Sequence, residues 1–297
     1  MPHLTALCNR WVFNTQLPSS SQAGHTIYDP SKSSTASSLA GATFNISYGD
    51  GSFAVGPVGT DTVDIGGATV TSQAIGLPTL VSSSFIADTA SNGLVGLGFS
   101  KLNTIKPQQQ KTFFDNVAPH LSQPVFTANL KHGTVGGYEF GAIDSTQFSG
   151  QLTTIPINAR NGFWEFTSTQ IAIGNGPAQT VTGGSGIAIA DTGTSLMIVD
   201  PSIVSTYWSQ VAGAVNSAQT GGVIFPCSSA LPDLSVAVGS NYMATISGSL
   251  LNFAQAGQDS QTGQACESPL PYFTFFVCGF DEKRFYAYGG SWLTWIM

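Results

Sequence analysis

One aspartate in a small turn is the residue of this sequence with the clearest chemical potential. Asp191 follows the apolar run GIAIA (186–190) and precedes Thr192, Gly193 and Thr194. The glycine lets backbone approach the carboxylate closely, and the hydroxyl groups can donate hydrogen bonds to it. Two carboxylates about 3 Å apart share one proton and can activate a water molecule for attack on a peptide carbonyl. The D-T-G turn occurs once in the chain, so a second carboxylate has to come from elsewhere.

The surrounding sequence predicts an all-β protein, with Asp191 at the end of a strand. Stretches rich in β-branched and aromatic residues alternate with clusters of Gly, Ser, Pro and Asn. Helical periodicity is limited to two surface segments, 112–121 and 200–215, and the second has an Asp cap followed by proline. The predicted strands are ATFNISYG (42–49), TDTVDIGG (60–67), GGYEFGAID (136–144), LTTIPI (152–157), FWEFTSTQIAIG (163–174) and GIAIAD (186–191).

The length of 297 residues allows one large domain or two lobes of about 150 residues each. A turn-rich stretch before residue 149 indicates a boundary between an N-terminal β-lobe (1–148) and a C-terminal β-lobe (149–297). From about residue 267 the composition changes, because aromatic residues crowd together around a charge run at 281–284. We expect this tail to be atypical of the lobe to which it belongs.

The charge balance argues against nucleic acid and anionic membranes as partners. Charged residues make up 8% of the chain, and 9 Lys and Arg against 16 Asp and Glu give a net charge of −7. Hydroxyl groups must therefore supply much of the polar surface, which favours tolerance of acid. No run of 18 apolar residues exists, and the first residues lack the apolar stretch of a signal peptide. We expect no membrane span and a start that is incomplete.

The four cysteines, Cys8, Cys227, Cys266 and Cys278, form no close pair of the kind that zinc or a redox motif needs. We therefore expect no metal and no cofactor. Cys227 and Cys266 could close a loop of about 40 residues in an oxidising compartment, and four free thiols are the alternative. The four histidines are scattered, and no G-x-S-x-G turn suggests a serine nucleophile. Asn-Ile-Ser at 45–47 is a glycosylation sequon.

Four stretches in a fixed order resemble the pepsin-like aspartic proteases, most closely the secreted acid proteases of filamentous fungi such as penicillopepsin and aspergillopepsin. The resemblance extends from about Trp11 to Cys266. It implies a bilobal all-β fold with a few short surface helices, secretion, and a monomer that holds a peptide or protein substrate in an extended conformation. The four stretches are WVFNT (11–15), ISYGDGS (46–52), NGLVGLGF (92–99) and IADTGTS (189–195).

The resemblance assigns roles to the turn at Asp191 and to two cysteines. Asp191 corresponds to the catalytic aspartate of the second lobe, supported by Thr192, while Gly193 and Thr194 contact the substrate. Cys227 and Cys266 have the separation of the second-lobe disulfide. The alternative for Asp191 alone is a structural carboxylate that stabilises its own turn.

The resemblance also implies a flap, the β-hairpin that closes over a bound peptide. An acidic residue at the flap tip lets the first specificity pocket accept Lys as well as apolar side chains. The alternative for Trp11, Tyr48 and Phe85 is that they are ordinary core residues of a β-sheet. The implied residues are Tyr48, Gly49 and Asp50 at the tip, Trp11 as the support of the flap tyrosine, and Phe85 with Leu94 in the apolar pocket wall.

The sequence departs from the family at both ends. In the family, the eight residues that end at the Trp of WVF begin with the first catalytic Asp, and here that span is LTALCNRW (4–11). Leu4 therefore stands at the position of that Asp, and leucine can neither ionise nor hold a water molecule. From Glu267 onward, the sequence matches neither the family's strand behind the second catalytic loop nor its final strand.

These departures leave three hypotheses. The first is an aspartic endopeptidase by descent, acting at acid pH, whose catalysis is lost by several orders of magnitude because Leu4 replaces one member of the dyad. The second is a noncatalytic peptide-binding protein that keeps its flap. The third is a chain that does not fold stably because outer strands are missing. A homodimer that joins two copies of Asp191 is a weaker variant of the first.

Overall fold

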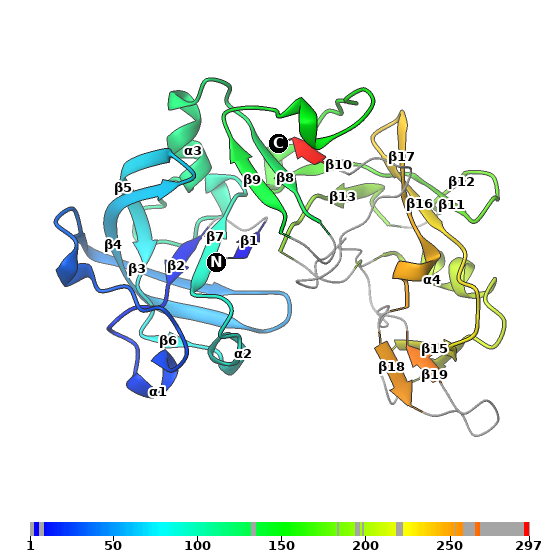
Figure 1. Ribbon diagram of the computed structural model, residues 1–297, viewed down its shortest axis with the longest axis horizontal. Coiled ribbons are helices and arrows are strands. Elements are labelled where there is room, and N and C mark those ends of the chain that lie inside the picture. Colours follow the sequence, from blue (N-terminus) through cyan, green and yellow to red (C-terminus); the bar gives the residue numbers. More distant parts are fainter. Residues whose placement is uncertain are drawn as a thin grey trace.

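The computed structural model describes residues 3–5, 9–131, 135–182, 184–193, 197, 199–217, 222–252, 254–257, 265–267 and 294–296. Of these, 3–5, 254–257, 265–267 and 294–296 are described by their backbone alone. Strands dominate, and two groups of them lie side by side in Figure 1, with β1 to β7 in one group and β11, β12, β16 and β17 in the other. The predicted all-β bilobal architecture is confirmed.

A large sheet organises the N-terminal half. Its longest strand, β4, alternates buried and more exposed residues over most of its length, so one face of the sheet packs on the core. The strand order is β1 (His3–Thr5), β7 (Gly93–Gly96), β2 (Arg10–Val12), β5 (Ala68–Gly76), β4 (Phe53–Ile65) and β3 (Ser37–Ser47), and β6 (Leu80–Val81) pairs with β4.

Strand β7 lies between β1 and β2, parallel to the first and antiparallel to the second. Gly93 makes this arrangement possible, because its φ is +146° and a Cβ there would lie 2.3 Å from the carbonyl oxygen of Trp11. The close approach of β2 and β7 therefore requires glycine at this position.

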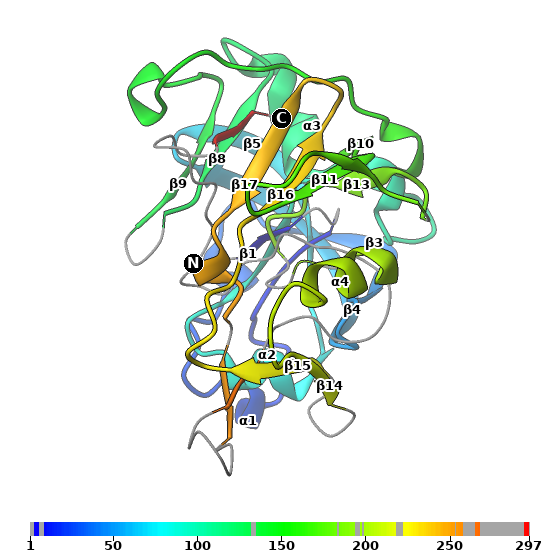
Figure 2. The ribbon, with the colours of Figure 1, turned by 90° about the vertical axis from the view of Figure 1, so that its right-hand side faces the viewer.

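The other described strands form four smaller sheets. The C-terminal strand β20 returns to β8, beside which Figure 1 draws it in red, and Figure 2 shows β11, β16 and β17 face on. The sheets are β10 (Glu165–Thr167) with β13 (Ile187–Ile189); β12 (Gln179–Thr180), β11 (Gln170–Ile173), β16 (Leu234–Val238) and β17 (Tyr242–Ile246); β14 (Val215–Ser217), β15 (Gly222–Pro226), β19 (Ala265–Glu267) and β18 (Ala254–Gly257); and β20 (Thr294–Ile296), β8 (Phe126–Asn129) and β9 (Gly137–Phe140).

The helices are short. The segment predicted at 112–121 forms α3 followed by a 3-10 turn, and the Thr112 side chain caps α3 by accepting from the N–H of Asp115. The helices are α1 (Ser19–Gln22), α2 (Ser83–Ala87), α3 (Phe113–Val117) and α4 (Pro201–Trp208), and the 3-10 turns are η1 (Pro30–Lys32), η2 (Ser100–Leu102), η3 (Ala118–His120), η4 (Ser145–Gln147), η5 (Ala159–Asn161) and η6 (Gly248–Leu250).

Two predicted elements are wrong. The helix predicted at 200–215 begins with its Asp200 cap as expected but ends at Trp208, and Val215 already belongs to β14. Gly213 has a φ of +78°, which a right-handed helix does not allow. The strand predicted at 152–157 is absent, because these described residues have an irregular backbone. Pro156 within it has no N–H to donate to a sheet.

Trp164 joins the two halves of the chain in one core. Its side chain is 9% exposed and packs in a cluster with α3, β7 and β8. The indole N–H donates to the carbonyl oxygen of Leu97 at 2.8 Å, and the ring lies 4.4 Å from that of Phe99. A second cluster contains buried residues from 171 to 251 alone. The boundary at 148/149 stays a prediction.

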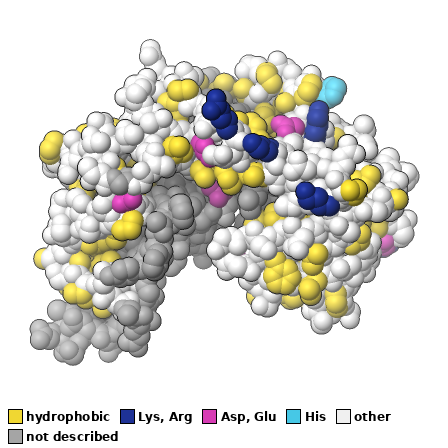
Figure 3. All heavy atoms as spheres, turned by 180° about the vertical axis from the view of Figure 1, so that it is seen from behind, with side chains coloured by type: hydrophobic (Ala, Val, Ile, Leu, Met, Phe, Trp, Pro, Cys, Tyr) yellow, Lys and Arg dark blue, Asp and Glu magenta, His cyan; other side chains and the backbone are white. Residues whose placement is uncertain are grey.

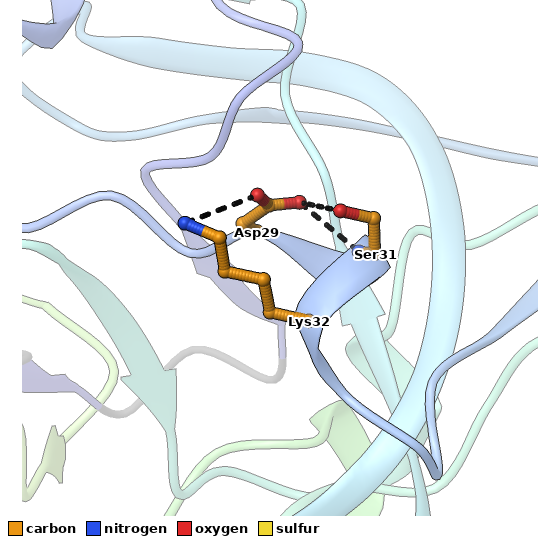
Figure 4. A network of polar contacts seen from close by, with 3 residues as sticks. All are labelled: Asp29, Ser31 and Lys32. Atoms are coloured by element: carbon orange, nitrogen blue, oxygen red, sulfur yellow. Dashed lines mark hydrogen bonds and ion pairs between the residues drawn. The ribbon is translucent and has the colours of Figure 1, made fainter.

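Charged groups are sparse on the surface. On the face seen in Figure 3, Lys, Arg, Asp and Glu side chains are few among largely uncharged atoms. One ion pair joins Lys32 Nζ to Asp29 Oδ2 at 3.6 Å at the edge of η1. Figure 4 shows that the same carboxylate also accepts from the N–H and hydroxyl of Ser31. Hydrogen bonds from Ser31 lower the pKa of Asp29, and the charge of Lys32 makes a smaller contribution in the same direction.

Candidate active site

The predicted flap is a hairpin of β3 and β4 whose tip is fixed by its own hydrogen bonds. The N–H of Tyr48 donates to Ser52 O at 2.8 Å, and the N–H of Gly51 donates to Tyr48 O at 3.0 Å. Asp50 Oδ1 accepts from the N–H of Ser52 at 2.9 Å and from its hydroxyl at 2.6 Å. Gly49 and Asp50 are exposed. The tip therefore presents a carboxylate that the turn itself holds in place.

The structure brings Trp11, Tyr48, Phe85 and Leu94 together in one core cluster. The indole N–H of Trp11, which is 0% exposed, donates to the Tyr48 hydroxyl at 2.8 Å. The Phe85 ring lies edge-on, 5.0 Å from that of Trp11 and 5.4 Å from that of Tyr48. The roles of Trp11 as the support of the flap tyrosine, and of Phe85 and Leu94 in the pocket wall, stay predictions.

The Tyr48 hydroxyl keeps its proton as a consequence of this packing. Burial raises the pKa of Tyr48, the hydrogen bond from Trp11 opposes that rise, and the nearby charge of Asp50 adds to it. Because Trp11 uses an acceptor site of the hydroxyl, the O–H remains a donor. The Tyr48 hydroxyl can therefore donate one hydrogen bond of its own.

His25 anchors the helix that carries Phe85, a role that sequence reasoning missed. The imidazole stacks on Phe13 with ring centroids 3.7 Å apart. Its Nδ1 lies 2.9 Å from the carbonyl oxygen of Ser91, and its Nε2 lies 3.2 Å from that of Ile86. Both carbonyls flank the end of α2. The sequence neighbours of His25, Gly24 and Thr26, give no sign of this contact.

Asp191 lies in the turn that the sequence predicts. Strand β13 leads into it, and the N–H of Ala190 donates to the carbonyl oxygen of Trp164 at 3.0 Å. Asp191 Oδ1 accepts from the N–H of Gly193 at 2.9 Å. Asp191 and Thr192 are half-buried and Gly193 is exposed. Thr194 lies outside the described residues.

Tyr138 of β9 is a second residue that sequence reasoning missed. Its side chain is hydrogen-bonded to that of Thr192 and lies close enough to Asp191 to sense its charge. Burial raises the pKa of Tyr138 to about 12, with the Thr192 bond lowering it and the charge of Asp191 raising it. The pattern GGYEF (136–140) indicates only a strand, so the long-range contact could not be read from it. A phenol from the strand pair β8–β9 thus holds the turn that carries the candidate catalytic carboxylate.

The remaining predicted residues are placed by their backbone only. Leu4 is paired with Val95 between β1 and β7, and its side chain is outside the described set. Its proximity to Asp191 stays a prediction. Cys266 lies in β19, opposite Phe225 of β15. Among the described residues, no group of three or more His, Cys, Asp or Glu side chains is arranged to hold a metal ion.

The ordered motifs, the flap contacts and the Asp191 turn agree with a comparison against known protein families. A family model described as eukaryotic aspartyl protease matches residues 5–274, so the chain belongs to that family. In the described part of the chain, no helix is long and apolar enough to cross a membrane.

Individual relatives are fungal. Aspartic protease PEP3 of Coccidioides posadasii is 54% identical over 261 residues, which cover 88% of this chain and 59% of that protein. Endothiapepsin of Cryphonectria parasitica is 50% identical over 80% of this chain and 56% of its own length. Penicillopepsin-1 of Penicillium janthinellum is 46% identical over 86% of this chain and 77% of its own length. The chain spans about three-fifths of the length of the first curated relatives that it matches.

Proposed function

We propose that this chain binds an extended peptide between the flap and the Asp191 turn, as an aspartic endopeptidase does. The hydrogen bond from Trp11 to the Tyr48 hydroxyl, with Phe85 against both rings, is the observation that carries the proposal. These contacts prepare the flap for a ligand before one arrives, which reduces the ordering needed on binding. Lys or an apolar side chain on the amino side of the bond is the expected preference, given the carboxylate of Asp50.

Peptide hydrolysis by this site needs two carboxylates. Asp191 and its partner would share a proton, activate a water molecule for attack on the peptide carbonyl, and protonate the leaving amine. One carboxyl has to be protonated, so the reaction is fastest at acid pH. With Leu4 at the partner position, we expect a rate lower by several orders of magnitude, since residues of a catalytic unit act together.

Restoring the partner carboxylate is the sharpest test. We expect Leu4→Asp to raise kcat/KM for an acid-protease peptide substrate by roughly 10³-fold or more, measured at about pH 3 to 5. Leu4→Asn is the matched control, because it adds polarity without a carboxylate, and it should leave the low rate unchanged. Asp191→Asn in the Leu4→Asp background should remove the gain. Equal rates for Leu4→Asp and Leu4→Asn in folded proteins would refute the assignment of position 4.

A noncatalytic peptide-binding role is the second candidate, favoured by flap contacts that do not involve position 4. Calorimetric binding of a peptide with a hydroxyl group in place of the scissile carbonyl would support it if the unaltered chain binds this ligand and cuts no substrate. Trp11→Phe should weaken the binding, because the Tyr48 hydroxyl loses its partner. Cleavage by the unaltered chain that Asp191→Asn abolishes would decide against this candidate.

We also propose a secreted monomer with a Cys227–Cys266 disulfide in the C-terminal lobe. Cys227 is disulfide-bonded. Phe225, two positions before Cys227 in the sequence, pairs with Cys266 between β15 and β19. A disulfide suits an extracellular compartment. Peptide mapping without reduction would identify the pair directly.

A further inference from the structure

Asn45, Ile46 and Ser47 form the one Asn-X-Ser/Thr sequence of the chain, and they lie on β3. Asn45 and Ser47 are exposed, whereas Ile46 between them is buried in the core below the flap. Both polar side chains therefore point away from the core, on the face opposite to Ile46. No hydrogen bond within the described part of the structure engages the Asn45 side chain.

Strand β3 is also the edge of its sheet. The N–H and C=O of Thr43 bond to Lys106, on the side away from β4. Because alternate residues of an antiparallel strand turn their backbone groups to the same side, those of Asn45 and Ser47 also face outward. Neither residue has a backbone partner on that side among the residues described. This leaves a short free edge directly before the flap tip, open to pairing with another chain.

We propose that Asn45 carries an N-linked glycan that covers this free edge. In the transfer, Asn45 Nδ2 bonds to the anomeric carbon of an oligosaccharide on a lipid diphosphate. The carbon–oxygen bond to the diphosphate breaks, the diphosphate leaves with the electron pair, and the amide nitrogen loses one proton. The glycan would stand on the face of the hairpin opposite to Ile46, away from the cluster of Trp11, Tyr48 and Phe85. This inference rests on the secretion proposed above.

The test is expression of the full chain in a eukaryotic host behind a cleavable export signal. Supplying the signal separates the result from natural secretion and from catalysis. Intact mass is measured on the pooled cell extract and medium, before and after an amidase that removes N-linked glycans and converts Asn45 to Asp. We expect added mass on the unaltered chain and on Ser47→Thr. Asn45→Gln and Ser47→Ala should show the polypeptide mass alone.

Polypeptide mass alone for the unaltered chain and for Ser47→Thr would overturn the proposal, as would glycan mass that persists in Ser47→Ala. Whether the glycan covers the free edge of β3 is tested separately, by sedimentation velocity at acid pH. Enzymatic removal of the glycan should increase the fraction of dimers and larger species. An unchanged distribution would overturn the covering role.

Discussion

Arg10 places a guanidinium group inside the N-terminal lobe. Its central carbon lies 5.9 Å from the centre of the Phe113 ring. Burial lowers the pKa of Arg10 to about 10, so the group is still charged at neutral and acid pH. Its buried Nε and Nη1 atoms have no hydrogen-bond partner among the described residues. A cation–π contact offsets only part of the desolvation of such a group.

Replacing this cation should stabilise the protein. We expect Arg10→Leu to raise the free energy of unfolding by about 1–3 kcal/mol, the usual cost of an unsatisfied buried polar group. Urea denaturation at pH 5 measures the change. Arg160→Leu is the matched control, because Arg160 is exposed, and it should stay within about 0.5 kcal/mol of the parent. A loss of stability in Arg10→Leu larger than in the control would contradict this account.

At the scale of elements, Asp61 ties strand β4 to the segment around η1. Its side chain is 5% exposed and accepts from the Tyr28 hydroxyl at 2.6 Å, the Ser33 hydroxyl at 2.9 Å and the Thr62 N–H at 2.7 Å. The Thr35 hydroxyl donates to it as well. Burial alone would raise the pKa of Asp61, but these hydrogen bonds outweigh it and lower the pKa.

This network predicts a pH-dependent contribution to stability. A lowered folded-state pKa means that the ionised form stabilises the fold above the unfolded pKa of about 3.9, and the contribution is lost as the pH falls through the folded-state value. We expect Asp61→Asn to cost about 1–3 kcal/mol at pH 6 and distinctly less at pH 2.5, by urea denaturation. Asp64→Asn, on the exposed face of the same strand, should change little. A cost that grows toward pH 2.5 would be inconsistent with this role.

The helices, strands and turns also show what could be predicted from the sequence. Stretches rich in β-branched and aromatic residues, bounded by turn residues, locate β3, β4 and β13, and the ordered motifs locate the flap and the Asp191 turn, because these signals are local. The end of α4 was misplaced because the apolar pattern continues past Trp208, while Gly213, which has a positive φ, interrupts a helix there. His25 and Tyr138 were missed because their hydrogen-bond partners lie more than 50 residues away in the chain, and no local pattern reports such contacts.

At the scale of the whole molecule, we expect Trp164 to couple the unfolding of the two halves of the chain. We expect Trp164→Phe to lower Tm by several degrees and to broaden or split the calorimetric transition, because the bond to Leu97 and part of the shared core are lost. Trp208→Phe is the matched control. Trp208 is also buried, but its Nε1 has no hydrogen-bond partner among the described residues, and its cluster lies within 171–251. Equal effects of the two substitutions on the transition shape would argue against coupling through Trp164.

The placement of β7 between β1 and β2 has a consequence for the time that folding takes. His3 pairs with Leu94 and Thr294 pairs with Asn129, so these strand pairs join residues far apart in the chain. Loops of about 90 residues and more have to close before these pairs form, and topologies dominated by such contacts fold slowly. Refolding after dilution from denaturant should therefore be slow and limited by competing aggregation. The survival time of the native state, rather than its equilibrium stability, would then set how long the protein stays folded.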